Sequence, residues 1–250
     1  MNNIFNVSED ENLPLAEIYD SLNSSTYAVL RGIISPHLIK QSVFLIKDKF
    51  NPDKDNPSTG ESPGDIMTNF QKLATGGENK RYNNFPRFFR TLYNPIWSDD
   101  IYEMREVFKK VSRVRNSIYG LPRNFAIEEV AENGYWTASR IHQYPAGGGF
   151  FIGHKDTTLL DVAKEKGTGF FQTILVMSKK GEDFESGGAF INDSDEKRLN
   201  IDDSVELGDI VIYNGQTFHG VEDIDPHRKL SLNTINGRLA GFVSLYKKMD

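Results

Sequence analysis

The sequence contains no cysteine, which excludes a disulfide framework, a thiolate metal site and a cysteine nucleophile. It also lacks an apolar run approaching the ~18 residues that a membrane-spanning helix needs. Its first residues are polar and acidic, whereas a signal peptide begins with a basic segment and an apolar core. We therefore expect a cytoplasmic protein with no membrane partner.

Basic residues are fewer than acidic residues. Lys and Arg number 29 against 35 Asp and Glu, which gives a formal net charge of −6. Proteins that bind nucleic acids usually carry a basic face, often with interleaved aromatic residues, and no such stripe is present. We expect no nucleic-acid partner, so a nucleic-acid demethylase is a disfavoured reading. The charge composition does not indicate the oligomeric state.

The spacing of apolar residues divides the chain near residue 133. Residues 1–133 are typical of helices and loops, because apolar positions recur there at helical spacing. In this part we expect a strand over 27–31, helices over 36–50 and 101–118, and a long loop over 51–84. That loop is a candidate lid, with a short helix over 67–73.

Residues 134–250 change to the period of two that is typical of β-strands. Strands are expected over 135–144, 169–178, 188–192, 209–213 and 238–247, with a hairpin turn at Asn236-Gly237. Many short strands joined by glycine turns predict a mainly β fold, a jelly roll or small barrel, with flanking helices from the N-terminal part. We interpret 1–250 as a single domain.

Only five histidines occur, and two of them lie in informative settings. His154 and Asp156 are two positions apart and follow a run of three glycines, so on a strand both side chains would point to the same face. His219 follows an apolar strand and is the natural third ligand. Two imidazoles and one carboxylate match the facial triad of non-haem Fe(II) oxygenases. The alternatives are a polar turn pair at 154–156 and a core histidine at 219.

Three segments carry a resemblance to a known family. SRIHQYPAGGGFFIGHKD, residues 139–156, resembles the first ligand segment of Fe(II)/2-oxoglutarate-dependent dioxygenases, including their prolyl-hydroxylase-like branch. Residues 208–221 resemble the second ligand segment, and GGAF at 187–190 resembles a turn and strand that lie between the two. The ordered match covers about residues 135–246. The resemblance implies a double-stranded β-helix, which is a jelly roll of cupin type.

The resemblance also implies Fe(II), 2-oxoglutarate as cosubstrate, and O2. His154, Asp156 and His219 would be the catalytic metal ligands, and Tyr144 would hydrogen-bond 2-oxoglutarate. A basic residue after the second histidine would pair with the C5 carboxylate, for which a guanidinium fork is well suited. The candidates, in order of preference, are Arg238, Arg228 and Lys229. The alternative for Tyr144 is an ordinary aromatic residue of a strand. The alternative for each of the three basic residues is a solvated surface charge.

A weaker resemblance concerns the substrate. PRFFRTLYNPIW, residues 86–97, is similar to a segment of free-amino-acid hydroxylases and halogenases, including lysine-modifying members. It implies that Arg90, or less favourably Arg87, binds the substrate carboxylate. Thr157 follows the ligand pair and would face the pocket. Phe151 departs from the pattern, because some members have a polar residue there.

The carboxylate of Asp156 separates hydroxylases from the related halogenases, which have Gly or Ala at this position. We therefore expect an enzyme that hydroxylates an unactivated C–H bond of a small molecule, most simply a free amino acid such as lysine. Two alternatives stay open. One is an oxygenase that acts on a protein side chain or a natural-product intermediate, and the other is a non-enzymatic, metal-binding cupin.

Overall fold

The computed structural model of the chain describes residues 3–56, 67–76, 85–157 and 160–247. Within these ranges, no helix is both long and apolar enough to cross a membrane. The strands are β1 Ile4–Asn6, β2 Tyr27–Arg31, β3 Phe70–Gly76, β4 Arg87–Tyr93, β5 Tyr135–Pro145, β6 Gly149–His154, β7 Phe171–Val176, β8 Gly188–Asn192, β9 Arg198–Asn200, β10 Ile210–Asn214, β11 His219–Ile224 and β12 Gly237–Lys247. The helices are α1 Leu15–Ser25, α2 Pro36–Lys49, α3 Arg105–Ile118 and α4 Leu160–Lys166, with the 3₁₀-helices η1 Pro52–Lys54 and η3 Ile201–Asp203.

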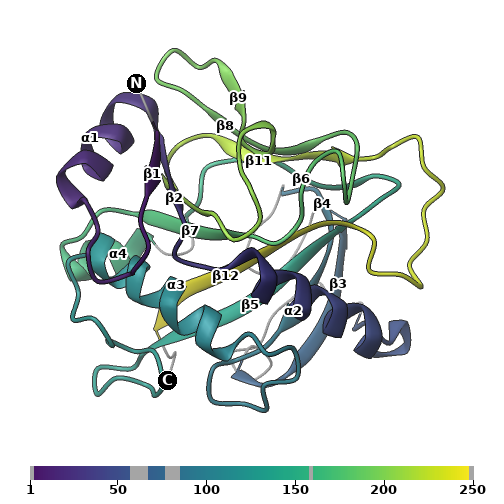
Figure 1. Cartoon of the computed structure of the whole chain (residues 1–250), viewed down its shortest axis with the longest axis horizontal. Helices are drawn as coiled ribbons and strands as arrows, with labels where there is room; N and C mark the ends of the chain where they lie inside the picture. The colour runs from purple at the N-terminus through teal and green to yellow at the C-terminus, as the bar shows by residue number, and fades with distance from the viewer. Residues whose placement is uncertain (1–2, 57–66, 77–84, 158–159, 248–250) are drawn as a thin grey trace.

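One hydrogen-bonded path joins the strands in the order β1-β2-β10-β7-β12-β5-β4-β6-β11-β8-β9, and β3 pairs with β4. The path folds over on itself, so that β6, β11 and β8 face the layer formed by β10, β7, β12 and β5 (Figure 1). A cavity between the two layers is lined by side chains from both of them. The predicted mainly β, jelly-roll fold is confirmed.

Helices cover one outer face of the larger layer. The apolar face of α3 is buried against β7 and β12, and it includes Phe108, Val111 and Val114. Ile39 and Ile46 of α2 belong to the same apolar cluster as these residues of α3, and Figure 1 shows α2 near one end of α3. Each large apolar side chain buried in this way contributes about 1.5–3 kcal/mol of transfer free energy. The prediction that N-terminal helices buttress the sheet is therefore confirmed.

Two predictions on local structure are wrong. A short helix was expected over 67–73, but residues 70–73 belong to β3, which pairs along its whole length with β4. The hairpin expected at Asn236-Gly237 is absent, because β12 pairs with β5 and β7 and not with the preceding strand β11. Gly237 serves a different purpose: its φ is +113°, and a Cβ there would lie 2.2 Å from the Tyr144 carbonyl oxygen.

The predicted lid lies largely outside the described residues, which leave out 57–66 and 77–84. The described parts of 51–84 contain η1 and β3 rather than loop alone. Strands β1 to β4, from the N-terminal part of the chain, join the same sheet as the later strands. β4 lies between β5 and β6, and its Phe89 packs against His142 and Tyr144, two residues that line the cavity.

Candidate metal centre

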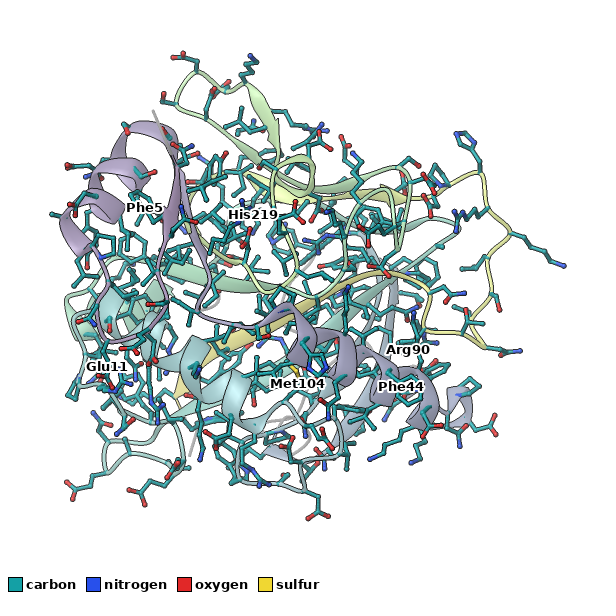
Figure 2. All side chains as sticks on the ribbon, in the orientation of Figure 1. Phe5, Glu11, Phe44, Arg90, Met104 and His219 are labelled. Atoms are coloured by element: carbon teal, nitrogen blue, oxygen red, sulfur yellow. The ribbon has the colours of Figure 1, made fainter. Side chains whose placement is uncertain are left out.

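Two strand ends bring the predicted ligands together. His154 is the last residue of β6 and His219 is the first residue of β11, and the two are direct partners in the antiparallel pairing of these strands. Their ring centroids are 4.5 Å apart. Candidate ligand atoms of both histidines and of Asp156 all lie within 4.8 Å of one another. Figure 2 shows His219 near the middle of the view, and its side chain is buried.

Asp156 reaches this cluster by a route other than the predicted one. β6 ends at His154, so the carboxylate does not stand on a strand. Its backbone is held by hydrogen bonds instead: the Asp156 N–H donates to the Gly215 carbonyl at 2.8 Å, and the Gln216 side-chain amide donates to the Asp156 carbonyl. Oδ1 then lies 3.4 Å from His154 Nε2, and Oδ2 lies 3.5 Å from His219 Nε2.

Both imidazoles are oriented for metal binding. His154 Nδ1 lies 2.8 Å from the Ile152 carbonyl oxygen, and His219 Nδ1 lies 2.8 Å from the Thr217 carbonyl oxygen. A carbonyl only accepts, so each Nδ1 carries the proton and each Nε2 directs its lone pair at the cluster. Such backbone contacts commonly fix the tautomer of a metal-binding histidine.

The electrostatics of the cluster suit a divalent cation. Burial lowers the pKa of His219, which favours the neutral imidazole that can bind a metal. Burial alone would raise the pKa of Asp156, but the two histidines and a hydrogen bond from Gln172 outweigh it and lower that pKa. Gln172, on β7, donates to Asp156 Oδ2 at 2.9 Å and so steadies the ionised carboxylate. Two imidazole nitrogens and one carboxylate fit the facial triad of non-haem Fe(II) sites.

The cluster opens into a cavity of about 110 Å³. Alternate residues of β5 contribute Arg140, His142 and Tyr144 to its wall, as expected for the inner face of a strand. Tyr213 from β10 also lines it, and the Tyr213 ring lies 4.7 Å from that of His219.

Arg238 lines the same cavity, near the start of β12. It is the register partner of Tyr144, and its guanidinium lies over the Tyr144 ring, 5.6 Å from the centroid. It forms a buried ion pair with Asp202, with 2.7 Å between Arg238 Nε and Asp202 Oδ2. Burial raises the pKa of Tyr144 to about 12 and raises that of Tyr213 well above 10, so both hydroxyls remain protonated donors.

Comparisons with known proteins place this arrangement in a recognisable fold. No family model and no curated protein sequence matches the chain. Among solved structures, a prolyl-4-hydroxylase from Pseudomonas putida matches with a TM-score of 0.55 at 12% identity, covering 94% of this chain and 100% of that one. A prolyl hydroxylase from Trichoplax adhaerens, in complex with a peptide fragment of the hypoxia inducible factor oxygen degradation domain, gives a TM-score of 0.60 at 10% identity, with coverages of 93% and 89%.

A third structure, from Caulobacter crescentus, is described as a 2OG-Fe(II) oxygenase family protein. It matches with a TM-score of 0.55 at 15% identity and covers 98% of this chain and 87% of that one. The chain has the fold of 2-oxoglutarate/Fe(II) oxygenases. The family resemblance seen in the sequence is thus confirmed at the level of the fold.

Within this oxygenase fold, the three basic residues predicted for the cosubstrate lie in different places. Arg238 lines the cavity, whereas Arg228 and Lys229 are exposed in the segment between β11 and β12. Arg228 is paired there with Asp225 at 3.4 Å and with Glu185 at 3.6 Å.

The residues predicted for the substrate are not brought to the cavity. Arg90 is fully buried, and its guanidinium donates to the Asp55 carboxylate at 2.6 Å and to the Leu232 carbonyl at 2.9 Å. It is the register partner of Gln143, which faces away from the cavity because its neighbours His142 and Tyr144 face inward. In Figure 2, Arg90 lies well apart from His219, on the side of the molecule that carries α2.

Thr157 follows Asp156 directly, but it is exposed and does not line the cavity. Arg87, the less favoured candidate for the substrate carboxylate, is half-buried on β4, opposite Phe151 of β6. Phe151 itself lines the cavity, where its ring lies 4.2 Å from that of His154.

Sequence reasoning missed several residues of the cavity wall. Arg140 and His142 could have been found by extending the alternation of β5 back from Tyr144. His142 accepts a hydrogen bond from Arg140 Nε at 3.2 Å, and its ring lies between those of Phe89 and Phe242 at 4.6 and 4.3 Å. Asp202 gave no signal, because it lies in a 3₁₀-turn amid other acidic residues.

Proposed function

We propose that this chain is a non-haem Fe(II)/2-oxoglutarate-dependent oxygenase that hydroxylates an unactivated C–H bond of a small molecule. The observation that carries the proposal is the cluster of His154, Asp156 and His219, oriented Nε2-inward at the wall of a cavity within this fold. These three residues would hold Fe(II). When bound, Fe(II) with 2-oxoglutarate and O2 supplies the oxidation of the C–H bond, with succinate and CO2 as coproducts.

Residues of the cavity wall would bind the cosubstrate. Arg238 is the basic residue of the cavity wall that can receive the C5 carboxylate, since a guanidinium presents parallel N–H donors to a carboxylate. The hydroxyls of Tyr144 and Tyr213 border the same cavity and have no hydrogen-bond partner among the described residues. We assign them as donors to oxygen atoms of 2-oxoglutarate.

For the substrate we propose a free amino acid, such as lysine. Once Arg238 is taken by the cosubstrate, Arg140 is the second guanidinium of the cavity wall, and it replaces Arg90 as the candidate for the substrate carboxylate. Arg140 is held by a hydrogen bond to Ser244 Oγ at 3.1 Å and lies over the Phe242 ring, 5.4 Å from its centroid. A guanidinium held in place in the wall of a cavity suits a small anionic ligand.

The alternative substrate is a side chain of a protein. The observation that favours it is the match to a prolyl hydroxylase whose structure contains a bound peptide fragment. A peptide-modifying enzyme would leave every free amino acid unchanged and would act only on the residue within a peptide.

The proposal is tested by turnover. Protein purified without oxygen is mixed with Fe(II), 2-oxoglutarate and each member of a panel of free amino acids, and air is then admitted. We expect one amino acid to gain the mass of an oxygen atom, with a matching rise in succinate. His154→Ala and Asp156→Ala should abolish both signals while circular dichroism shows an intact fold.

Two results would redirect the proposal. Succinate release without any modified amino acid would favour a peptide or another substrate, which a peptide panel then tests. Retained iron without a visible absorption band on addition of 2-oxoglutarate, and without succinate, would contradict the oxygenase and favour a non-enzymatic cupin.

A further inference from the structure

Arg238, which is proposed to bind the cosubstrate carboxylate, is already paired with a buried carboxylate, that of Asp202. The side chains of Asp202 and Arg238 are each only 4% exposed. Arg238 Nε donates to Asp202 Oδ2 at 2.7 Å, and Nη2 lies 3.3 Å from Oδ1. Both residues line the cavity that the metal cluster shares. The pair is therefore part of the site and not a surface contact.

The surrounding backbone is built to receive Asp202. Oδ2 also accepts a hydrogen bond from the Ala189 N–H at 2.5 Å. The preceding residue is Gly188, with φ +122°, and a Cβ at this position would lie 2.7 Å from the same oxygen. Gly188 belongs to the GGAF segment, so one function of its missing side chain is to let the carboxylate approach.

The guanidinium has two edges, and Asp202 uses one of them. Nε and Nη2 form the edge that faces Asp202, whereas no described residue accepts a hydrogen bond from Nη1. Because Arg238 lines the cavity, the edge with Nη1 is the one left for a ligand carboxylate. A cosubstrate bound there would share a single cation with Asp202.

We propose that Asp202 is a built-in counter-anion that stabilises the empty site and weakens the binding of 2-oxoglutarate. This inference rests on the proposed function and names the residue that sets cosubstrate affinity. A buried guanidinium without an anion is costly, and Asp202 supplies that anion before the ligand arrives. After binding, two carboxylates on adjacent edges of one buried guanidinium repel each other, because little solvent screens them there.

An orienting effect of Asp202 would act in the opposite direction, by holding Arg238 ready for the ligand. Packing already provides most of that order. Arg238 stands on β12 opposite Tyr144 of β5, and its guanidinium rests on the Tyr144 ring. Repulsion between the carboxylates is therefore the larger effect, and removal of the charge should tighten binding.

The experiment measures binding without turnover. Protein loaded with Mn(II) is titrated calorimetrically with 2-oxoglutarate, for the wild type, Asp202→Asn and Asp203→Asn. We expect the Kd of Asp202→Asn to fall about tenfold, with a lower thermal unfolding midpoint in the absence of ligand. Asp203→Asn is the matched control: its carboxylate is 52% exposed and pairs with Lys180, so its Kd should equal that of the wild type. An unchanged or higher Kd for Asp202→Asn overturns the inference.

A second measurement uses the wild type alone, in case Asp202→Asn does not fold. 2-Oxopentanoate has the same chain length as 2-oxoglutarate but lacks the distal carboxylate. Because Asp202 already neutralises Arg238, the two Kd values should lie within about tenfold of each other, and a larger ratio contradicts the inference. If wild-type protein with Mn(II) binds no 2-oxoglutarate at all, the proposed function fails and this inference with it. Binding by the wild type with no gain in Asp202→Asn defeats only the inference.

Discussion

Burial fixes the charge of single side chains in the cavity wall, and His142 is the clearest case. Its pKa lies well below 6.5, first because of burial and then because of the nearby charges of Arg140, Arg238 and Arg87. The folded protein therefore keeps His142 neutral at a pH where the unfolded chain takes up a proton. This difference in proton uptake makes stability depend on pH.

For metal-free protein, we expect the titration of His142 to leave the free energy of unfolding unchanged above about pH 6.5. Below that pH it should lower this free energy progressively, by up to ~1.4 kcal/mol per pH unit. The sign follows because the unfolded state binds more protons as the pH falls. His142→Gln should remove this part of the pH dependence, as measured by urea unfolding at pH 7, 6 and 5. His37→Gln, at an exposed position of α2, should leave the slope unchanged. Equal slopes for wild type and His142→Gln would contradict the prediction.

Arg140 carries the prediction for the substrate. If it binds the substrate carboxylate, Arg140→Gln should raise the KM for the amino acid about tenfold to a hundredfold, since a hydrogen bond to a charged group contributes roughly 1.5–3 kcal/mol. The Kd for 2-oxoglutarate should stay the same, which separates this effect from a general loss of structure. Arg198→Gln is the control, because Arg198 also lies over a ring, that of Phe190, but is paired with Glu222 at an exposed position. An unchanged KM in Arg140→Gln would exclude Arg140 from this role.

At the scale of residues, the sequence predicted site residues best where they lie close together in the chain. His154 and Asp156 are two residues apart, and a distant histidine after an apolar strand completed the set, so the cluster could be predicted. Arg90 could not be placed, because its direction depends on the pairing of β4 with β5, and the sequence did not predict β4 as a strand. Asp202 and Tyr213 depend on tertiary packing in the same way.

At the scale of elements, Arg90 ties several segments together. Its guanidinium contacts the Asp55 carboxylate after η1, Gln143 on β5 and the Leu232 carbonyl before β12. Arg90 is fully buried and Asp55 is 12% exposed. These contacts indicate that Arg90 has a structural role and links several elements of the fold.

Asp55→Asn should therefore lower the free energy of unfolding by about 3 kcal/mol, because it leaves a buried cation without its anion. The Kd for 2-oxoglutarate should not change. Asp53→Asn is the matched control, since Asp53 is an exposed residue of η1 in the same segment. Urea unfolding measures the difference. If Asp55→Asn kept full stability but lost turnover of the amino acid, a role of Arg90 at the substrate would be favoured again.

Elements were predictable where one period persisted. α3 and β12 have long, regular apolar patterns and were expected close to their observed bounds. β3 and β4 were missed because they lie in or beside a segment rich in Asn, Gly and Pro, and only their mutual pairing reveals them. The Asn-Gly signal at 236–237 misled, because Gly237 is needed for a close backbone approach to Tyr144 and not for a hairpin.

At the scale of the whole molecule, the site joins the two layers of the jelly roll. The fold class itself was predictable from many short strands with glycine turns, but the contents of the cavity were not. His154 and His219 come from the layer that contains β6 and β11, whereas Gln172 and Arg238 come from β7 and β12 in the other layer. A metal and cosubstrate bound between them would contact both layers at once, so their binding should stabilise the fold as a unit.

We expect Mn(II) and 2-oxoglutarate, each at about 100 times its Kd, to raise the free energy of unfolding by about 2.7 kcal/mol each. For a chain of this length, each kcal/mol corresponds to a rise of roughly 2–4 °C in the thermal midpoint. EDTA should reverse the shift due to the metal. Asp156→Ala removes the carboxylate ligand and should abolish most of it, whereas Asp161→Ala, at a carboxylate that is 97% exposed on α4, should respond like the wild type. An equal shift in Asp156→Ala would mean that the metal binds elsewhere, and the assignment of this cluster would then be wrong.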